Sequence, residues 1–87
     1  MTSQRQVWKY ELHRDSYINM QRGAQIIDCG CQNGSVYVWA ILRPDRGREA
    51  RDLCNFATGE PVPDNWDYVG TAATPDREFV WHVFERR

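Results

Sequence analysis

AQIIDCGCQNGSVYVWAIL, from Ala24 to Leu42, is the stretch that decides the fold of this 87-residue chain. Two runs rich in β-branched and aromatic residues flank Asn33-Gly34. Such a dipeptide between strands is typical of a type I′ hairpin turn, which needs a positive φ at both positions. The second run, Ser35–Leu42, is apolar on both faces and therefore predicts a central strand that is covered on both sides. The stretch predicts an antiparallel hairpin in the middle of the protein.

Short alternating runs extend this β pattern in both directions along the chain. In Val7–Leu12, large apolar side chains alternate with Lys9 and Glu11, which is the period of two of a half-buried strand. Further strands are predicted near residues 51–58, at Trp66–Ala72 and at Glu78–Glu85. No stretch shows the apolar spacing of an amphipathic helix. We therefore expect an all-β, mostly antiparallel fold, either a single small barrel or a sandwich of about six short strands.

Size and charge narrow the classes of protein to which the chain can belong. Its length predicts a single β domain over residues 1–87, with an ordered core at about residues 6–85. The formal charge of −1, from 11 basic and 12 acidic residues, gives no overall attraction to nucleic acid, so we do not expect a nucleic-acid partner. The polar start MTSQRQ and the lack of a long apolar run predict a cytoplasmic protein with no membrane partner.

The three cysteines predict free thiols. Their number is odd, and the spacing of Cys29 and Cys31 places both on one face of a strand without the two-residue gap of a zinc knuckle. We therefore expect neither a metal nor a cofactor.

The titratable residues do not form a recognisable catalytic motif. The Glu78–Glu85 run places His82 on a sheet face, where a packed histidine is the ordinary outcome. Cys54 would act as a nucleophile with His82 as its base only if their strands were neighbours. We predict that the protein is not an enzyme and has no catalytic residues, and a small-ligand enzyme using Cys54 and His82 is the alternative.

Aromatic and arginine side chains indicate ligand binding instead. Seven Trp and Tyr rings lie in four predicted strands, more than one small core needs, so some should line a pocket or a subunit interface. Such rings stack on nucleobases, and the arginines at positions 43, 46, 48 and 51 flank a charged loop that offers phosphate contacts. Nearby acidic residues partly neutralise that loop, so a solvated surface loop is the alternative. The predicted ligand-binding residues are Trp39, Arg43, Arg51, Trp66 and His82.

The segment TGEPVPDN, residues 58–65, has one glycine and two prolines, which excludes a phosphate-binding loop with several converging N–H groups. We expect a turn at Gly59, an extended run over Glu60–Pro63 and a second turn at Asp64-Asn65. A loop this stiff would rim a ligand pocket or a subunit contact, or would simply connect two strands.

Several elements resemble an uncharacterised family of small bacteriophage proteins. In order, they are WKYEL, QNG, TGEPVP, YVGT and FVWHVFE, spread over nearly the whole chain. The resemblance implies a phage origin, a compact β domain and a location in the host cytoplasm. The segment RPDRGREARD departs from that family pattern.

Taken with the absence of a catalytic motif, this resemblance favours a non-enzymatic phage accessory protein. It would sequester a nucleotide-type immune signal or block a host defence protein. A nucleic-acid-binding protein and a minor virion protein are further alternatives. Open sheet edges and the surplus of rings also predict a homodimer or larger closed oligomer, with Glu78–Glu85 in the interface.

Overall fold

The computed structural model describes residues 4–14 and 17–87, and every regular element in that part of the chain is a β-strand. The strands are β1 (Gln6–Glu11), β2 (Tyr17–Gln21), β3 (Gln25–Gln32), β4 (Ser35–Leu42), β5 (Arg48–Ala57), β6 (Trp66–Ala73) and β7 (Val80–Arg86). The prediction of an all-β, antiparallel fold is confirmed, with seven strands in place of about six. Among the described residues, no helix is long and apolar enough to cross a membrane.

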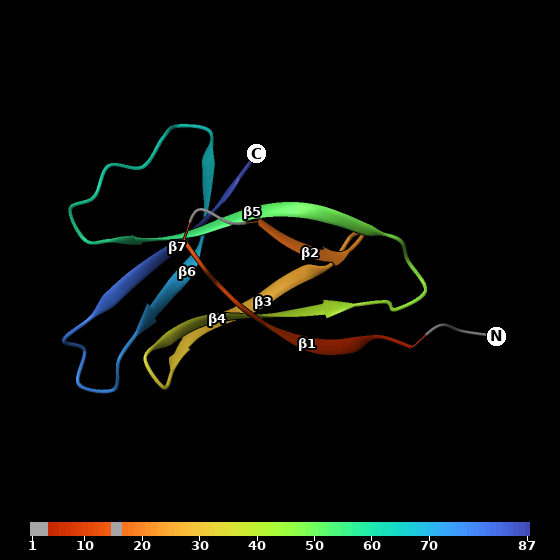
Figure 1. Cartoon of the computed structure of the whole chain (residues 1–87), viewed down its shortest axis with the longest axis horizontal. Coiled ribbons are helices and arrows are strands. Elements are labelled where there is room, and N and C mark those ends of the chain that lie inside the picture. Colours follow the sequence, from red (N-terminus) through yellow and green to blue (C-terminus); the bar gives the residue numbers. More distant parts are fainter. Residues whose placement is uncertain (1–3, 15–16) are drawn as a thin grey trace.

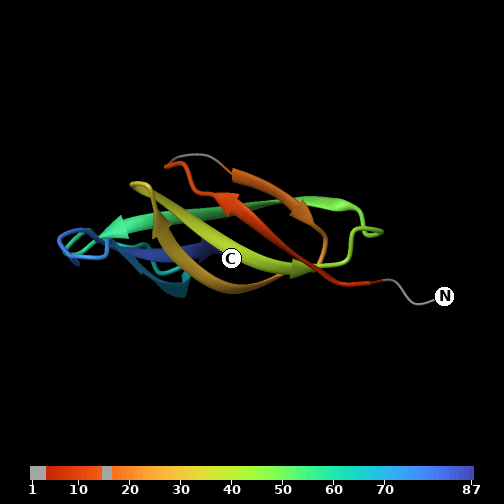
Figure 2. The ribbon, with the colours of Figure 1, turned by 90° about the horizontal axis from the view of Figure 1, so that it is seen from below.

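The strands form two antiparallel sheets (Figure 1). The first sheet has the order β1-β4-β3, and the second has the order β2-β5-β7-β6. Figure 2 shows the flat molecule from its side, and its extents are 47 × 29 × 17 Å. Of the two architectures that the sequence predicts, the sandwich therefore fits residues 4–14 and 17–87 better than a closed barrel does.

The central hairpin forms as the sequence predicts. Gln32 and Ser35 face each other across the turn, where Asn33 has a φ of 50° and Gly34 a φ of 80°. β4 lies between β1 and β3. One of its faces is fully buried between the sheets, while the opposite face is half-buried. The buried side chains are those of Val36, Val38, Ala40 and Leu42.

The core lies between the two sheets. The largest fully buried side chains come from both layers and are those of Met20, Leu53, Val38 and Val83. Gly70 of β6 lies against Cys29 of β3, since a Cβ added at Gly70 would be only 2.7 Å from the Cys29 Sγ. The absence of a side chain at position 70 thus allows the two sheets to approach each other.

One strand and the start of another differ from the prediction, and the last strand is shifted to Val80–Arg86. β2, which the alternation did not reveal, pairs with the first half of β5 and buries Met20 completely. β5 begins at Arg48, so the predicted loop Arg43–Glu49 is shorter than expected. The reason is pairing: Arg48 faces Gln21 and Glu49 faces Met20, which holds these charged residues in an extended conformation.

β7 lies between β5 and β6, with a partner along each of its two edges. Its apolar residues on both faces therefore fit a strand in the middle of a sheet. A subunit interface at this strand, as predicted from the sequence, would have to use a face of the strand, because its edges are already hydrogen-bonded.

Candidate functional site

The loop at residues 58–65 has both predicted turns. They occur at Thr58-Gly59 and Asp64-Asn65, the run between them belongs to no regular element, and Gly59 has a φ of 91°. The Glu60 side chain accepts a hydrogen bond from the Ala57 N–H over 2.9 Å, and the Glu60 N–H donates to the Ala57 carbonyl over 3.0 Å. The loop is therefore held at its start by both the backbone and the side chain of one residue.

This loop borders an open groove of about 380 Å³ on the outward face of the second sheet. We call it the aromatic groove, and its main lining residues are Phe56, Pro61, Pro63, Trp66, Arg14 and Arg86. Phe56 and Trp66 come from strands on the two sides of β7, and the prolines come from the loop. The two prolines fix the backbone of the wall, so little ordering is needed when a ligand enters.

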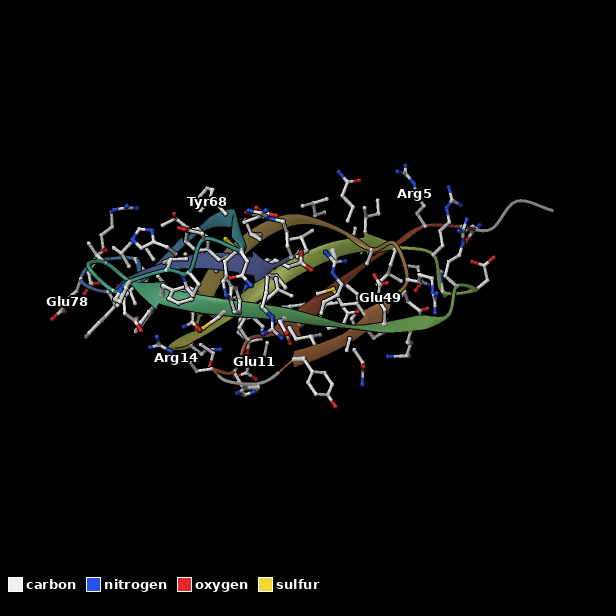
Figure 3. The ribbon with its side chains drawn as sticks, turned by 90° about the horizontal axis from the view of Figure 1, so that it is seen from above. Arg5, Glu11, Arg14, Glu49, Tyr68 and Glu78 are labelled. Carbon is white, nitrogen blue, oxygen red and sulfur yellow. The ribbon has the colours of Figure 1, made fainter. Side chains whose placement is uncertain are left out.

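Aromatic rings in edge-to-face contact form a row that includes the groove residues Phe56 and Trp66. Phe56 contacts Trp66 with ring centroids 5.7 Å apart and Phe84 with centroids 5.6 Å apart, and Tyr68 continues the row at 5.5 Å from Phe84. Such edge-to-face pairs each contribute about 0.5–1.5 kcal/mol beyond area burial. In Figure 3, Tyr68 lies near one edge of the ribbon and Arg14 near the opposite edge. The rings thus form a fixed surface.

Two arginines lie over these rings. The Arg14 guanidinium carbon is 5.9 Å from the Phe56 ring centroid, and that of Arg86 is 5.9 Å from the Trp66 centroid. Arg14 also pairs with Glu60, and Arg86 pairs with Asp52. These ion pairs orient the two guanidinium groups at the rim and balance their charge. Each guanidinium has further N–H groups beyond the one in its ion pair, and these are donors that a phosphate can use.

The structure does not gather the five predicted ligand-binding residues into one site. Trp66 lines the aromatic groove on the outward face of the second sheet. Trp39 lies on the outward face of the first sheet, because its neighbours Val38 and Ala40 are fully buried between the sheets. The two tryptophans therefore face away from each other, and one small ligand cannot contact both.

Arg51 has a different environment from the one expected. Its Nε and Nη2 donate to the two carboxylate oxygens of Glu85 over 2.6 and 2.8 Å, and its Nη1 donates to the Ala24 carbonyl over 2.5 Å. The hydrogen bonds to Glu85 raise the pKa of the Arg51 guanidinium above its ordinary value. Arg51 thus connects β5, β7 and the start of β3, which is a structural role.

Arg43 lines a smaller cavity of about 220 Å³ at the other end of the molecule. We call it the arginine pocket, and its charged lining residues are Arg5, Arg22, Arg43 and Arg46. In Figure 3, Arg5 lies near one end of the long axis and Glu78 near the opposite end. The predicted anion contact of the charged loop is therefore separate from the aromatic groove.

His82 faces outward on β7, opposite Phe56. Its Nε2 lies 2.9 Å from the Thr58 Oγ1 and its Nδ1 lies 3.4 Å from the Thr71 Oγ1. Thr71 in turn shares a hydrogen bond of 2.7 Å with the Tyr68 hydroxyl. The histidine thus belongs to a polar network of hydroxyl groups beside the aromatic rings.

The strands that carry Cys54 and His82 are neighbours, as the enzyme alternative requires. The two residues are offset, however, since Cys54 faces Phe84 and His82 faces Phe56 across the strand pair. The Phe56 and Phe84 rings are in edge contact on the same face. The Cys54 thiol donates to the Asn55 carbonyl over 3.8 Å, whereas the two ring nitrogens of His82 lie beside the hydroxyl groups of Thr58 and Thr71.

The three cysteines lie in half-buried positions. Cys29, Cys31 and Cys54 are free thiols, and burial between the sheets raises the pKa of Cys29, with a smaller contribution from the charge of Asp28. Within residues 4–14 and 17–87, no three His, Cys, Asp or Glu side chains cluster in a way that would hold a metal ion.

Sequence reasoning missed Arg14 and Arg86, which lie over the rings of the aromatic groove. They are separated by 46 residues from Glu60 and by 34 residues from Asp52, their respective ion-pair partners. No local pattern reports contacts across such separations. The one available signal was the alternation of β7, since Phe84 and Arg86 fall on the same face of a strand.

No curated protein and no solved structure matches the chain. The model of one protein family, a domain of unknown function (DUF7352), matches residues 3–87. Because this match spans nearly the whole sequence, the protein belongs to the DUF7352 family.

Proposed function

We propose that the protein is a non-enzymatic binding protein that holds a nucleotide-type ligand in the aromatic groove and sequesters it without turnover. The observation that carries the proposal is the position of Trp66 beside two prolines and two arginines around one groove of about 380 Å³. Ligand sites of drug-sized molecules are about 300–1,000 Å³ and combine apolar walls with a few polar groups. The aromatic groove has this size and composition.

The chemistry of a nucleotide fits the two kinds of side chain in the groove. A base has a planar π-face, and stacking on an aromatic side chain contributes about 1–3 kcal/mol. Trp66 is the half-buried ring that lines the groove, whereas Phe56 lies deeper and is 8% exposed. Phosphate groups would compete with the carboxylates of Asp52 and Glu60 for hydrogen bonds from the N–H groups of Arg86 and Arg14. The remaining polar network around His82 lies beside the groove and does not enter the proposed contacts.

The biological setting of the proposal rests on the sequence resemblance alone. We propose that the ligand is a nucleotide-type immune signal in the cytoplasm of a bacterium that is infected by a bacteriophage. Binding without turnover would lower the free concentration of such a signal in proportion to the amount of protein.

Calorimetry against cyclic dinucleotides and linear nucleotides tests this function. We expect at least one of them to bind with a Kd below about 1 mM, and Trp66→Leu to weaken that binding by about 5- to 150-fold, the equivalent of 1–3 kcal/mol. Trp39→Leu is the matched control, because it removes a ring from the outward face of the other sheet. It should leave binding unchanged. Mass spectrometry of the recovered nucleotide should show an unmodified molecule.

Four outcomes would count against the proposal. The absence of binding across the panel, or equal weakening by both tryptophan variants, would refute a nucleotide site in the aromatic groove. Steady conversion of the ligand would place the protein among the enzymes. Tight binding of a host protein with no nucleotide binding would favour the predicted alternative, in which the protein blocks a host defence protein.

A further inference from the structure

We propose that the arginine pocket is a second, independent binding site, which takes a small and multiply charged phosphate anion of the pyrophosphate type. The pocket is about 220 Å³, below the size of drug-sized ligand sites, so it suits a small anion better than a whole nucleotide. Its four arginines come from three separate parts of the chain: the segment before β1, the β2–β3 turn and the β4–β5 turn.

Strand register explains why these arginines meet. Gln6 of β1 faces Leu42 of β4, and Gln25 of β3 faces Ile41. The start of β1, the start of β3 and the end of β4 therefore lie at one end of the first sheet. Each of these strand ends continues into a segment that carries arginine, and these arginines line the same cavity.

Backbone hydrogen bonds fix the two turns that carry three of the arginines. The Arg22 N–H donates to the Gly47 carbonyl over 2.5 Å, which connects the β2–β3 turn to the β4–β5 turn. Within the second turn, the Arg46 N–H donates to the Arg43 carbonyl over 3.2 Å. The backbone positions of these three arginines are thus set before an anion arrives, so only their side chains need to be ordered on binding.

The charged residues that line the pocket are all arginines. Among the described residues that line it, none carries a carboxylate. Like charges around one small cavity repel each other, and a bound anion would relieve that repulsion. The planar fork of arginine matches phosphate oxygens bidentately, so phosphate is the anion that this set of donors fits best.

Titration calorimetry with inorganic pyrophosphate and tripolyphosphate at low salt is the direct test. We expect saturable binding to the wild-type protein, with an affinity that falls as salt is added. The double variant Arg22→Ala/Arg46→Ala should lose affinity by about tenfold or more for each arginine, since charge-assisted hydrogen bonds are the stronger class. A rise in the melting temperature with pyrophosphate should disappear in the same variant.

Arg77→Asn is the matched control for the loss of positive charge. Arg77 is exposed in the β6–β7 turn and has a φ of 58°, a conformation that Asn tolerates. This variant should bind pyrophosphate as the wild type does. Equal weakening by Arg77→Asn would show attraction to the overall charge and overturn the proposal, as would the absence of saturable binding by the wild type. Trp66→Leu separates the two sites, because it should weaken nucleotide binding and leave pyrophosphate binding unchanged.

Discussion

Gly70→Ala tests the contact that lets the two sheets pack together. A Cβ at this position would lie 2.7 Å from the Cys29 Sγ, closer than side-chain atoms normally approach, and Cys29 is held in β3 between the sheets. Overpacking of this kind costs about 1–3 kcal/mol. The lower conformational entropy of Ala in the unfolded chain offsets about 0.4–1 kcal/mol of that cost. We therefore expect Gly70→Ala to lower the free energy of unfolding by about 1–2 kcal/mol.

Urea denaturation of a double-mutant cycle isolates this contact. Cys29→Ala removes the sulfur, so Gly70→Ala should be neutral or slightly stabilising in the Cys29→Ala background. Gly47→Ala is the control for a glycine replacement without a clash, since its nearest side-chain atom, the Arg22 Nη2, would be 3.7 Å from the new Cβ. The reasoning is refuted if Gly70→Ala has the same cost with and without the Cys29 sulfur.

Three further predictions concern the turn, the ion pair and the titrating groups. Gly34→Ala should cost about 1–2 kcal/mol in urea denaturation, because Gly34 has a φ of 80°, and a neutral effect would contradict the type I′ turn. Glu85→Gln should cost about 2 kcal/mol, between the values of exposed and buried pairs, since the side chain of Arg51 is 17% exposed; a cost below about 0.5 kcal/mol would speak against a stabilising pair. The hydrogen bond from the Thr74 hydroxyl lowers the pKa of Asp76. The ionised Asp76 therefore stabilises the fold above its unfolded pKa of about 4, and this stabilisation is lost as the pH falls through the lower folded pKa. Asp76→Asn should remove this part of the acid dependence of stability, and an unchanged pH profile would contradict the assignment.

Local chemistry explains why much of the fold was predictable. The Asn33-Gly34 turn needs only two residues with positive φ, and the loop at residues 58–65 is fixed by its glycine and prolines, so both could be recognised without tertiary information. β2 was missed because it is five residues long and has only Met20 fully buried. The start of β5 was misplaced because pairing with β2 extends a charged segment that is typical of a loop.

The candidate sites were only partly predictable, because strand direction and pairing decide where a charged side chain ends up. Trp66 and the prolines of the aromatic groove were recognised, since they are close together in the sequence. Arg43 and Arg51 were grouped because they flank one loop, but Arg51 lies in β5 and pairs with Glu85 of β7. The partner of Arg51 was thus decided by a strand that is distant in the sequence.

The overall charge of the chain is a weak guide to its ligands for the same reason. A formal charge of −1 predicts no general attraction to anions, yet four of the 11 basic residues line one cavity. At physiological salt the field of a charge is screened within about 8 Å. An anion that enters the arginine pocket is therefore influenced mainly by the charges close to it, which include those of the four arginines that line the pocket. This short range is the reason why a chain with nearly balanced charge can carry an anion site at one end and a neutralised, ring-lined groove elsewhere on its surface.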